Sequence, residues 1–218
     1  MVYLWFLTTF IALVLTIMLI NKASKHFAWH YLPWIVAFAS FFFCSFASWT
    51  SYLTGWTPWL YKGWYVAGAV LVALMGLGQM LFLKLNKWAI LFSVYIGLLF
   101  IWFVWSILYA PVDHQLLTRQ GEIGGSALPR DVRLFSPLFT IPGSLALIGG
   151  AFYSALRHKS KEGWLIGLGA LILASGGTLV RFDIQLALPI ANLIGITMIF
   201  LGTNTSSLSS RSLSATNA

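Results

Sequence analysis

Seven segments of the sequence are long and apolar enough to cross a lipid bilayer as helices. A membrane-spanning helix needs roughly 17–25 predominantly apolar residues to cross a hydrocarbon core about 30 Å thick. None of the segments shows the alternating pattern of a membrane barrel strand. The sequence therefore predicts an all-α bundle of seven transmembrane helices in one domain, residues 1–202. The predicted spans are Tyr3–Ile20, Leu32–Trp49, Trp64–Leu83, Trp88–Tyr109, Phe135–Leu156, Gly163–Val180 and Ile184–Leu201.

The composition indicates that lipid surrounds most of the chain. Charged residues make up only 8% and hydrophobic residues 59%, whereas a soluble domain carries about 25% charged residues. The first apolar run has no basic segment before it, so we expect a retained helix and not a cleaved signal peptide. The serine-rich residues 203–218 predict a disordered tail.

The positions of lysine and arginine predict that the N-terminus lies outside and the C-terminus inside. In that orientation eight Lys and Arg residues fall on the inner side and five on the outer, and six of the seven lysines are inside. The positive-inside rule uses this count. We therefore interpret the net charge of +8 as an orientation signal facing lipid, and expect the bilayer and not nucleic acid as the partner.

A charged pair separates the last two predicted spans. Arg181 and Asp183 fill a short outer turn, where charge is tolerated far better than at the bilayer centre. The favoured interpretation is a solvated turn with a weak ion pair. The alternative is a polar lip above a cavity between helices, with Gln185 and Asn192 beneath it.

Three further residues are candidate ligand contacts. Gln79 lies deep within the third span, where it could contact a ligand or, like Asn192, form a hydrogen bond between helices. Trp49 and Trp105 lie at the predicted outer edge, in an interfacial belt or in the wall of an outward-facing pocket.

Small residues and prolines indicate how the helices pack. Gly163 and Gly167, in the stretch GWLIG, are four residues apart and predict a close approach between helices. Glycine-rich helix faces could also bind membrane-protein partners or a second copy of the chain. Pro142 and Pro189 fall within predicted spans and should bend them.

Residues 110–134 form one long, polar outer loop with seven charged or histidine side chains. Loops longer than about 12–15 residues tend to be functional or disordered. A charged lid and an exposed tether are both open interpretations.

The sequence lacks the motifs of familiar enzymes. It has no HExxH, CxxC or GxSxG motif, and no pair of carboxylates lies within the spans. His26 and His30 are four residues apart but have no third ligand in view, and the seventh span has no lysine for a Schiff base. We therefore expect no enzyme activity, no metal and no cofactor.

Two resemblances bear on the fold. The segments ALPRDVRLFSPLFTIPGSLALIGGAFYSALR (127–157), GLGALILASGGTLVRF (167–182) and GWYVAGAVLVALMGLGQMLFL (63–83) resemble a widespread, uncharacterised bacterial family of seven-helix integral membrane proteins. That resemblance implies a multi-pass protein of the bacterial inner membrane and carries no activity. A weaker internal similarity between residues 47–74 and 174–201 gives a layout similar to the SWEET sugar transporters, although their proline–glutamine pairs are absent.

These features lead to one expectation and two alternatives. We expect a non-catalytic membrane protein that binds a small apolar or amphipathic ligand, or that is a subunit of a larger membrane complex. One alternative is a small-solute transporter built from two three-helix repeats. The other is a sensory module that acts through a separate partner chain.

Overall fold

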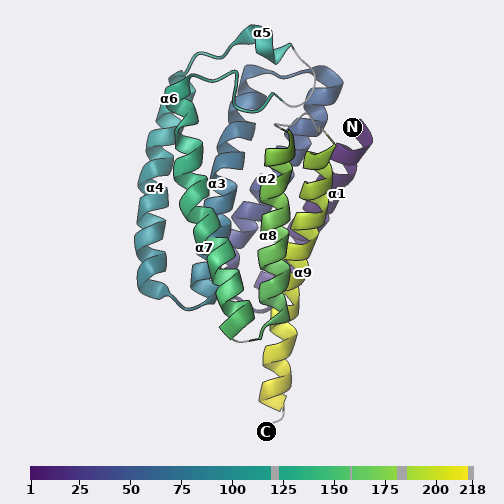
Figure 1. Cartoon of the computed structure of the whole chain (residues 1–218), viewed down its shortest axis with the longest axis vertical. Coiled ribbons are helices and arrows are strands. Elements are labelled where there is room, and N and C mark those ends of the chain that lie inside the picture. The colour runs from purple at the N-terminus through teal and green to yellow at the C-terminus, as the bar shows by residue number, and fades with distance from the viewer. Residues whose placement is uncertain (119–122, 158, 181–185, 216–218) are drawn as a thin grey trace. The chain divides into compact units, whose positions relative to one another are not determined.

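A computed structural model describes the whole chain except residues 119–122, 158, 181–185 and 216–218, and it describes the backbone alone at residues 177–180 and 204–215 (Figure 1). Helices provide all the regular secondary structure of the described residues, in agreement with the predicted all-α class. The helices are α1 (Val2–Lys25), α2 (Tyr31–Thr54), α3 (Pro58–Phe82), α4 (Asn86–Tyr109), α5 (His114–Leu117), α6 (Arg130–Arg133), α7 (Phe135–Arg157), α8 (Lys161–Val180) and α9 (Ala187–Ala215).

The chain divides into two compact units, where the sequence predicted one domain. Unit 1 is Met1–Ser144 and unit 2 is Leu145–Ala218, so the boundary falls within α7. Each unit is described by itself below.

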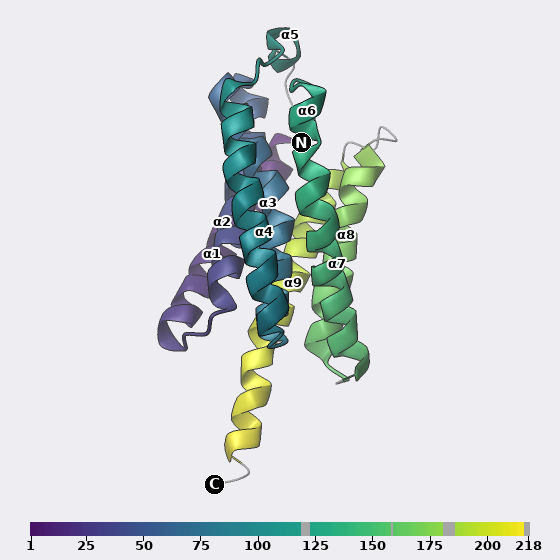
Figure 2. The same cartoon turned by 90° about the vertical axis from the view of Figure 1, so that its left-hand side faces the viewer.

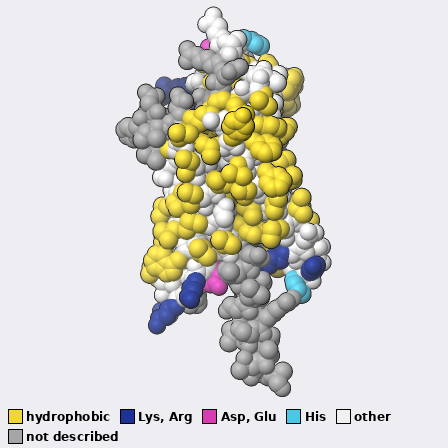
Figure 3. Space-filling view, turned by 90° about the vertical axis from the view of Figure 1, so that its right-hand side faces the viewer, with side chains coloured by type: hydrophobic (Ala, Val, Ile, Leu, Met, Phe, Trp, Pro, Cys, Tyr) yellow, Lys and Arg dark blue, Asp and Glu magenta, His cyan; other side chains and the backbone are white. Residues whose placement is uncertain are grey.

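Among the described residues, five helical segments are long and apolar enough to cross a membrane. They are α1, α2, α3, α4 and the segment Arg130–Arg157, which contains α6 and α7, and a shorter apolar helix covers Ala187–Thr203. Figure 3 shows one face, on which hydrophobic side chains predominate. These features are consistent with the multi-pass membrane protein that the composition predicts.

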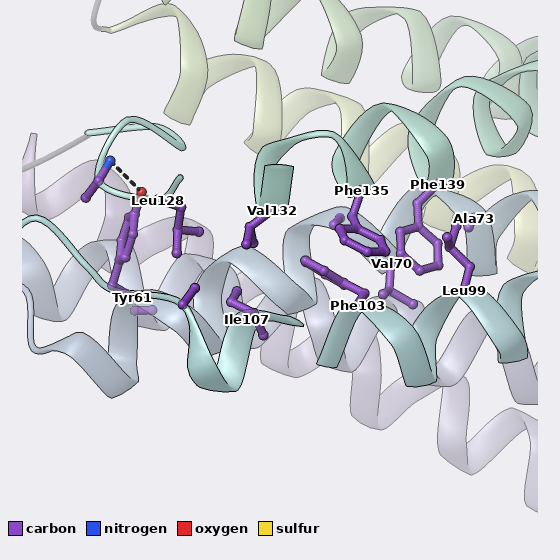
Figure 4. Close-up of a cluster of buried hydrophobic side chains, with 14 of the residues drawn as sticks. Tyr61, Val70, Ala73, Leu99, Phe103, Ile107, Leu128, Val132, Phe135 and Phe139 are labelled. Atoms are coloured by element: carbon purple, nitrogen blue, oxygen red, sulfur yellow. Dashed lines mark hydrogen bonds between the residues drawn. The ribbon is translucent and has the colours of Figure 1, made fainter. Parts of the chain in front are cut away.

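In unit 1, consecutive long helices run side by side and antiparallel. α2 packs against both α1 and α3, and α3 packs against α4, which faces the viewer in Figure 2. The first part of α7 adds Phe135 and Phe139 to the core, where their rings lie 5.1 and 5.7 Å from the ring of Phe103 (Figure 4). This aromatic cluster joins α4 to α7.

The described part of the segment 110–134 packs against the long helices of unit 1, to which it belongs. It contains the short helices α5 and α6, and four of its side chains lie in the core of unit 1: Leu117, Ala127, Leu128 and Val132. The interpretation as an exposed tether is therefore wrong for the described part of this segment. The charged residues of this segment suggested a lid or a tether in the sequence. Its apolar residues determine its position, because their burial removes apolar area from water or headgroups.

Tyr61 on α3 holds this segment in place. Its hydroxyl donates a hydrogen bond of 2.7 Å to the carbonyl of Gly124. It also accepts one of 3.3 Å from the amide of Ala127, which a dashed line marks in Figure 4. The ring is fully buried and contacts Trp56 and Trp64. One hydroxyl thus ties the loop to the first turns of α3.

Replacing Tyr61 by phenylalanine should loosen the segment 110–134 while leaving the helices in place. The change leaves the amide of Ala127 without its partner, and an unsatisfied buried donor costs about 1–3 kcal/mol. Limited proteolysis of the purified protein should cut within residues 110–134 several times faster than in the wild type. Tyr109→Phe is the matched control, because its side chain is 72% exposed; equal cleavage in both variants would contradict this anchoring role.

In unit 2, glycines allow close contacts between helices. A Cβ at Gly163 would lie 2.6 Å from the carbonyl oxygen of Ala151 and 2.7 Å from the amide nitrogen of Ala155, both on α7. A Cβ at Gly167 would lie 3.3 Å from the ring of Phe152. The close approach predicted from GWLIG is confirmed.

Two expectations for α9 differ from the structure. Because α9 begins at Ala187, Pro189 lies in its first turn, where backbone N–H groups have no helical partner and proline is tolerated. The predicted bend within the last span is therefore wrong. The backbone of α9 also continues to Ala215, through residues expected to form a disordered tail. Residues 203–215 contain neither proline nor glycine, so an existing helix can extend into them.

Candidate functional site

An apolar groove lies between α2, α3 and α4 in unit 1. Its volume is about 630 Å³, within the usual range for small-molecule sites. On α3 the lining extends from Trp59 to Leu77, a distance of about 27 Å along the helix axis. The groove therefore follows the helices over most of the thickness of a hydrocarbon core.

Large aliphatic side chains form the buried surface of the groove. Val70 on α3 and Ile96 and Ile107 on α4 are each less than a tenth exposed. Phe100 and Val66 lie further out, and Val36 of α2 lines the groove as well. With so few polar atoms, the groove suits a hydrocarbon chain and offers almost nothing to a sugar or an ion.

Lys62 is the only charged residue that lines the groove. Its Nζ donates a hydrogen bond of 2.9 Å to the carbonyl of Leu108 and lies 5.7 Å from the ring centroid of Trp59. The carbonyl belongs to the last turn of α4, which lacks helical donors and attracts cations. Neither of these two partners carries a negative charge, so neither offsets the charge of the lysine at this end of the groove.

Gly97 leaves the middle of the groove open on the α4 side. A Cβ built at Gly97 would meet no atom within 4 Å, so the space beside it is empty of protein. On the opposite wall a Cβ at Gly63 would lie 3.2 Å from the ring of Phe43. Space beside Gly97 is therefore available to a ligand, whereas Gly63 serves helix packing.

Three of the predicted site residues, Arg181, Asp183 and Gln185, lie outside the described residues. The choice between a solvated turn and a polar lip over a cavity therefore stays a prediction. Asn192 is half-buried in α9 of unit 2.

Gln79 is fully buried in unit 1. Among the described residues, neither its Nε2 nor its Oε1 has a hydrogen-bond partner, so none of them forms the expected bond between helices with Gln79. It does not line the groove, although Leu77 does. Its amide is an unsatisfied polar group in an apolar setting, which is destabilising unless a water or another group reaches it.

The two predicted tryptophans lie apart from the groove. Trp49 is half-buried and packs against the rings of Phe6 and Phe46, at 5.3 and 6.0 Å. Trp105 is 65% exposed and lies 4.9 Å from the ring of Tyr109. Trp105 lines a separate open pocket near the end of α4.

His30, which the sequence analysis considered together with His26, directly precedes α2 and lies among aromatic rings. Its ring is 4.3, 5.1 and 5.5 Å from the rings of Tyr31, Trp34 and Phe82. Burial, with a smaller contribution from Lys22, lowers the pKa of His30 to about 4. The imidazole is thus neutral at pH 7 and joins the α1–α2 turn to α3 by packing.

The sequence did contain a signal for Lys62. Six of the seven lysines fall on the predicted inner side, and Lys62 is the exception. The predicted span began at Trp64, but Thr57 caps α3 through a 3.3 Å hydrogen bond from the amide of Leu60, and Pro58 follows as the first helical residue. This capping signal places Lys62 on the helix and not in a loop.

In comparisons with known proteins, no family model, no curated protein and no solved structure matches this chain.

Proposed function

We propose that the chain is a non-catalytic integral membrane protein that binds a lipid-like amphiphile with an anionic headgroup in the α2–α3–α4 groove. The observation that carries this proposal is the pairing of a long apolar groove with one charged lining residue, Lys62, near one end. A hydrocarbon chain would lie along Val70 and Ile96, and the headgroup would meet the ammonium.

The dimensions favour a lipid-like ligand over a small solute. A groove about 27 Å long matches extended hydrocarbon chains, and its open side allows entry from the bilayer. The predicted transporter would need polar groups along its path, yet Gln79 does not line this groove. The groove therefore supports a binder over a small-solute carrier.

The membrane arrangement that accompanies this function is part of the proposal. The five long apolar segments, together with α8 and α9, correspond one by one to the seven predicted spans. The lysine count supports an outside N-terminus, which would place Lys62 and the segment 110–134 in the outer leaflet. The family resemblance supports a bacterial inner membrane.

Native mass spectrometry of the purified protein with added phosphatidylglycerol and phosphatidylcholine tests the proposal. The wild type should retain phosphatidylglycerol in preference to phosphatidylcholine. Lys62→Met should lower this preference about fivefold, because one lysine near a lipid surface contributes about 1 kcal/mol. Lys62→Arg should keep it.

Gly97→Leu should remove the retention of phosphatidylglycerol. The new side chain would occupy the groove, and its Cβ would meet no atom within 4 Å. Loss of glycine from a helix interior also favours helix formation by about 1 kcal/mol. Gly149→Leu in α7 is the matched control, since a Cβ there also meets no atom within 4 Å. Unchanged phosphatidylglycerol retention in Gly97→Leu would contradict the groove as the binding site. A wild-type dimer that Gly97→Leu disrupts would indicate that a second copy of the chain occupies the groove instead.

A further inference from the structure

A second pocket lies between the end of α4 and the segment leading into α6. Its volume is about 430 Å³, and its lining residues are Trp105, Ser106, Tyr109, Ala110, Pro111, Pro129, Asp131 and Val132. The groove uses Val104, Ile107 and Leu108 of the same helical turns. The two sites therefore occupy different sides of α4.

Two aromatic rings form one wall of this pocket. The rings of Trp105 and Tyr109 have centroids 4.9 Å apart and an interplanar angle of 53°. Both side chains are largely exposed, at 65% and 72%, so their faces are not covered by other residues. Inclined, uncovered aromatic faces attract cations through the negative potential of the ring.

Asp131 supplies the only charge among the lining residues. It is exposed on α6, and its neighbours Arg130 and Arg133 do not line the pocket. No ion pair involving Asp131 occurs within the described part of the chain. The carboxylate is thus available to a ligand and repels anions.

The position of the acid depends on well-packed neighbours. Val132 is 2% exposed and anchors α6 in the core of unit 1, one residue after Asp131. Where the segment 110–134 leaves α4, the amide of Asp113 donates a 3.0 Å hydrogen bond to the carbonyl of Ala127. The pocket is therefore built from an ordered helix end and an anchored loop.

We propose that Trp105, Tyr109 and Asp131 bind a quaternary ammonium group, free in solution or as the headgroup of a zwitterionic lipid. A quaternary ammonium has no N–H donor and interacts mainly through aromatic faces and a nearby negative charge, which this pocket combines. A metal ion would need several more oxygen or nitrogen ligands than one carboxylate. This proposal is independent of the amphiphile groove.

Choline binding to the full-length protein, purified in a maltoside detergent, tests this site by titration of the choline methyl NMR signal. Choline should bind saturably, and its uncharged carbon analogue should not. Trp105→Ala and Asp131→Asn should each weaken choline binding about fivefold, the equivalent of about 1 kcal/mol for one cation–π or charge contact. Trp88→Ala is the matched control, since Trp88 is on the same helix and is also 65% exposed.

Equal binding of the carbon analogue, or equal weakening by Trp88→Ala, would overturn the proposal, as would the absence of saturable choline binding. Nanodiscs identify the source of the ligand. Competition with free choline by phosphatidylcholine nanodiscs, but not by phosphatidylglycerol nanodiscs, would indicate a lipid headgroup, and no competition by either would indicate a soluble cation. Gly97→Leu should leave choline binding unchanged, so failure of this site and failure of the groove are distinguishable.

Discussion

Replacing Gly143 by leucine is expected to separate α7 from α3 and to lower the free energy of unfolding of unit 1 by at least about 3 kcal/mol. A Cβ at Gly143 would lie 2.7 Å from both Cα and N of Ala73 and 2.8 Å from the carbonyl carbon of Val72. These are backbone atoms of α3, so they cannot move aside by changing a rotamer. The helices themselves must move apart.

Thermal unfolding in detergent, followed by circular dichroism, measures this effect. Even Gly143→Ala should lower the unfolding temperature, although alanine favours a helix by about 1 kcal/mol. Gly149→Ala, also in α7, should keep or raise it, because a Cβ there meets no atom within 4 Å. If both alanine variants unfolded at the same temperature, the close contact between α7 and α3 would be wrong.

Replacing Phe103 by alanine should destabilise unit 1 by about 3–5 kcal/mol, the usual range for a buried aromatic side chain. Phe103 has no exposed surface and contacts the rings of Tyr65, Phe135 and Phe139. Its removal would leave a cavity where α4 meets α7. The expected result is a large fall in the unfolding temperature, with the remaining protein still helical.

Phe10→Ala provides the comparison, because Phe10 is 57% exposed on α1. When a lipid-facing phenylalanine is replaced by alanine, lipid tails can fill the space of the lost ring, so the packing between helices changes little. The same substitution should therefore have a much smaller effect at this position. Similar losses at both positions would contradict the aromatic cluster of Figure 4 as the core of unit 1.

The helices could be predicted closely from the sequence, since each predicted span overlaps one long helix. The errors lie at the ends. α3 begins at Pro58 and not at Trp64, because a hydropathy window follows apolar residues whereas a helix begins at its cap. α9 begins three residues later than predicted, at Ala187, and this moves Pro189 from the helix interior to the first turn.

The candidate site could be predicted only in part. The search for polar residues within spans selected Gln79, which is buried and does not line the groove. The search for tryptophans at the outer edge selected Trp49, which packs against phenylalanines. A site in an apolar groove is a space that side chains leave unfilled, as beside Gly97. No single residue type in the sequence indicates such a space. Trp105 was selected for its ring, but its partner Asp131 was placed near it only by the fold of the loop.

The amino-acid sequence by itself determined that this chain is helical and suited to lipid, because both properties add up residue by residue along each segment. The tertiary structure alone decided where hydrocarbon-sized space remains between helices, which lysine faces it and how the 110–134 segment folds back. Those features depend on side chains from helices distant in sequence that share one gap. The hydropathy and helix propensity of each segment, taken separately, carry no information about that gap.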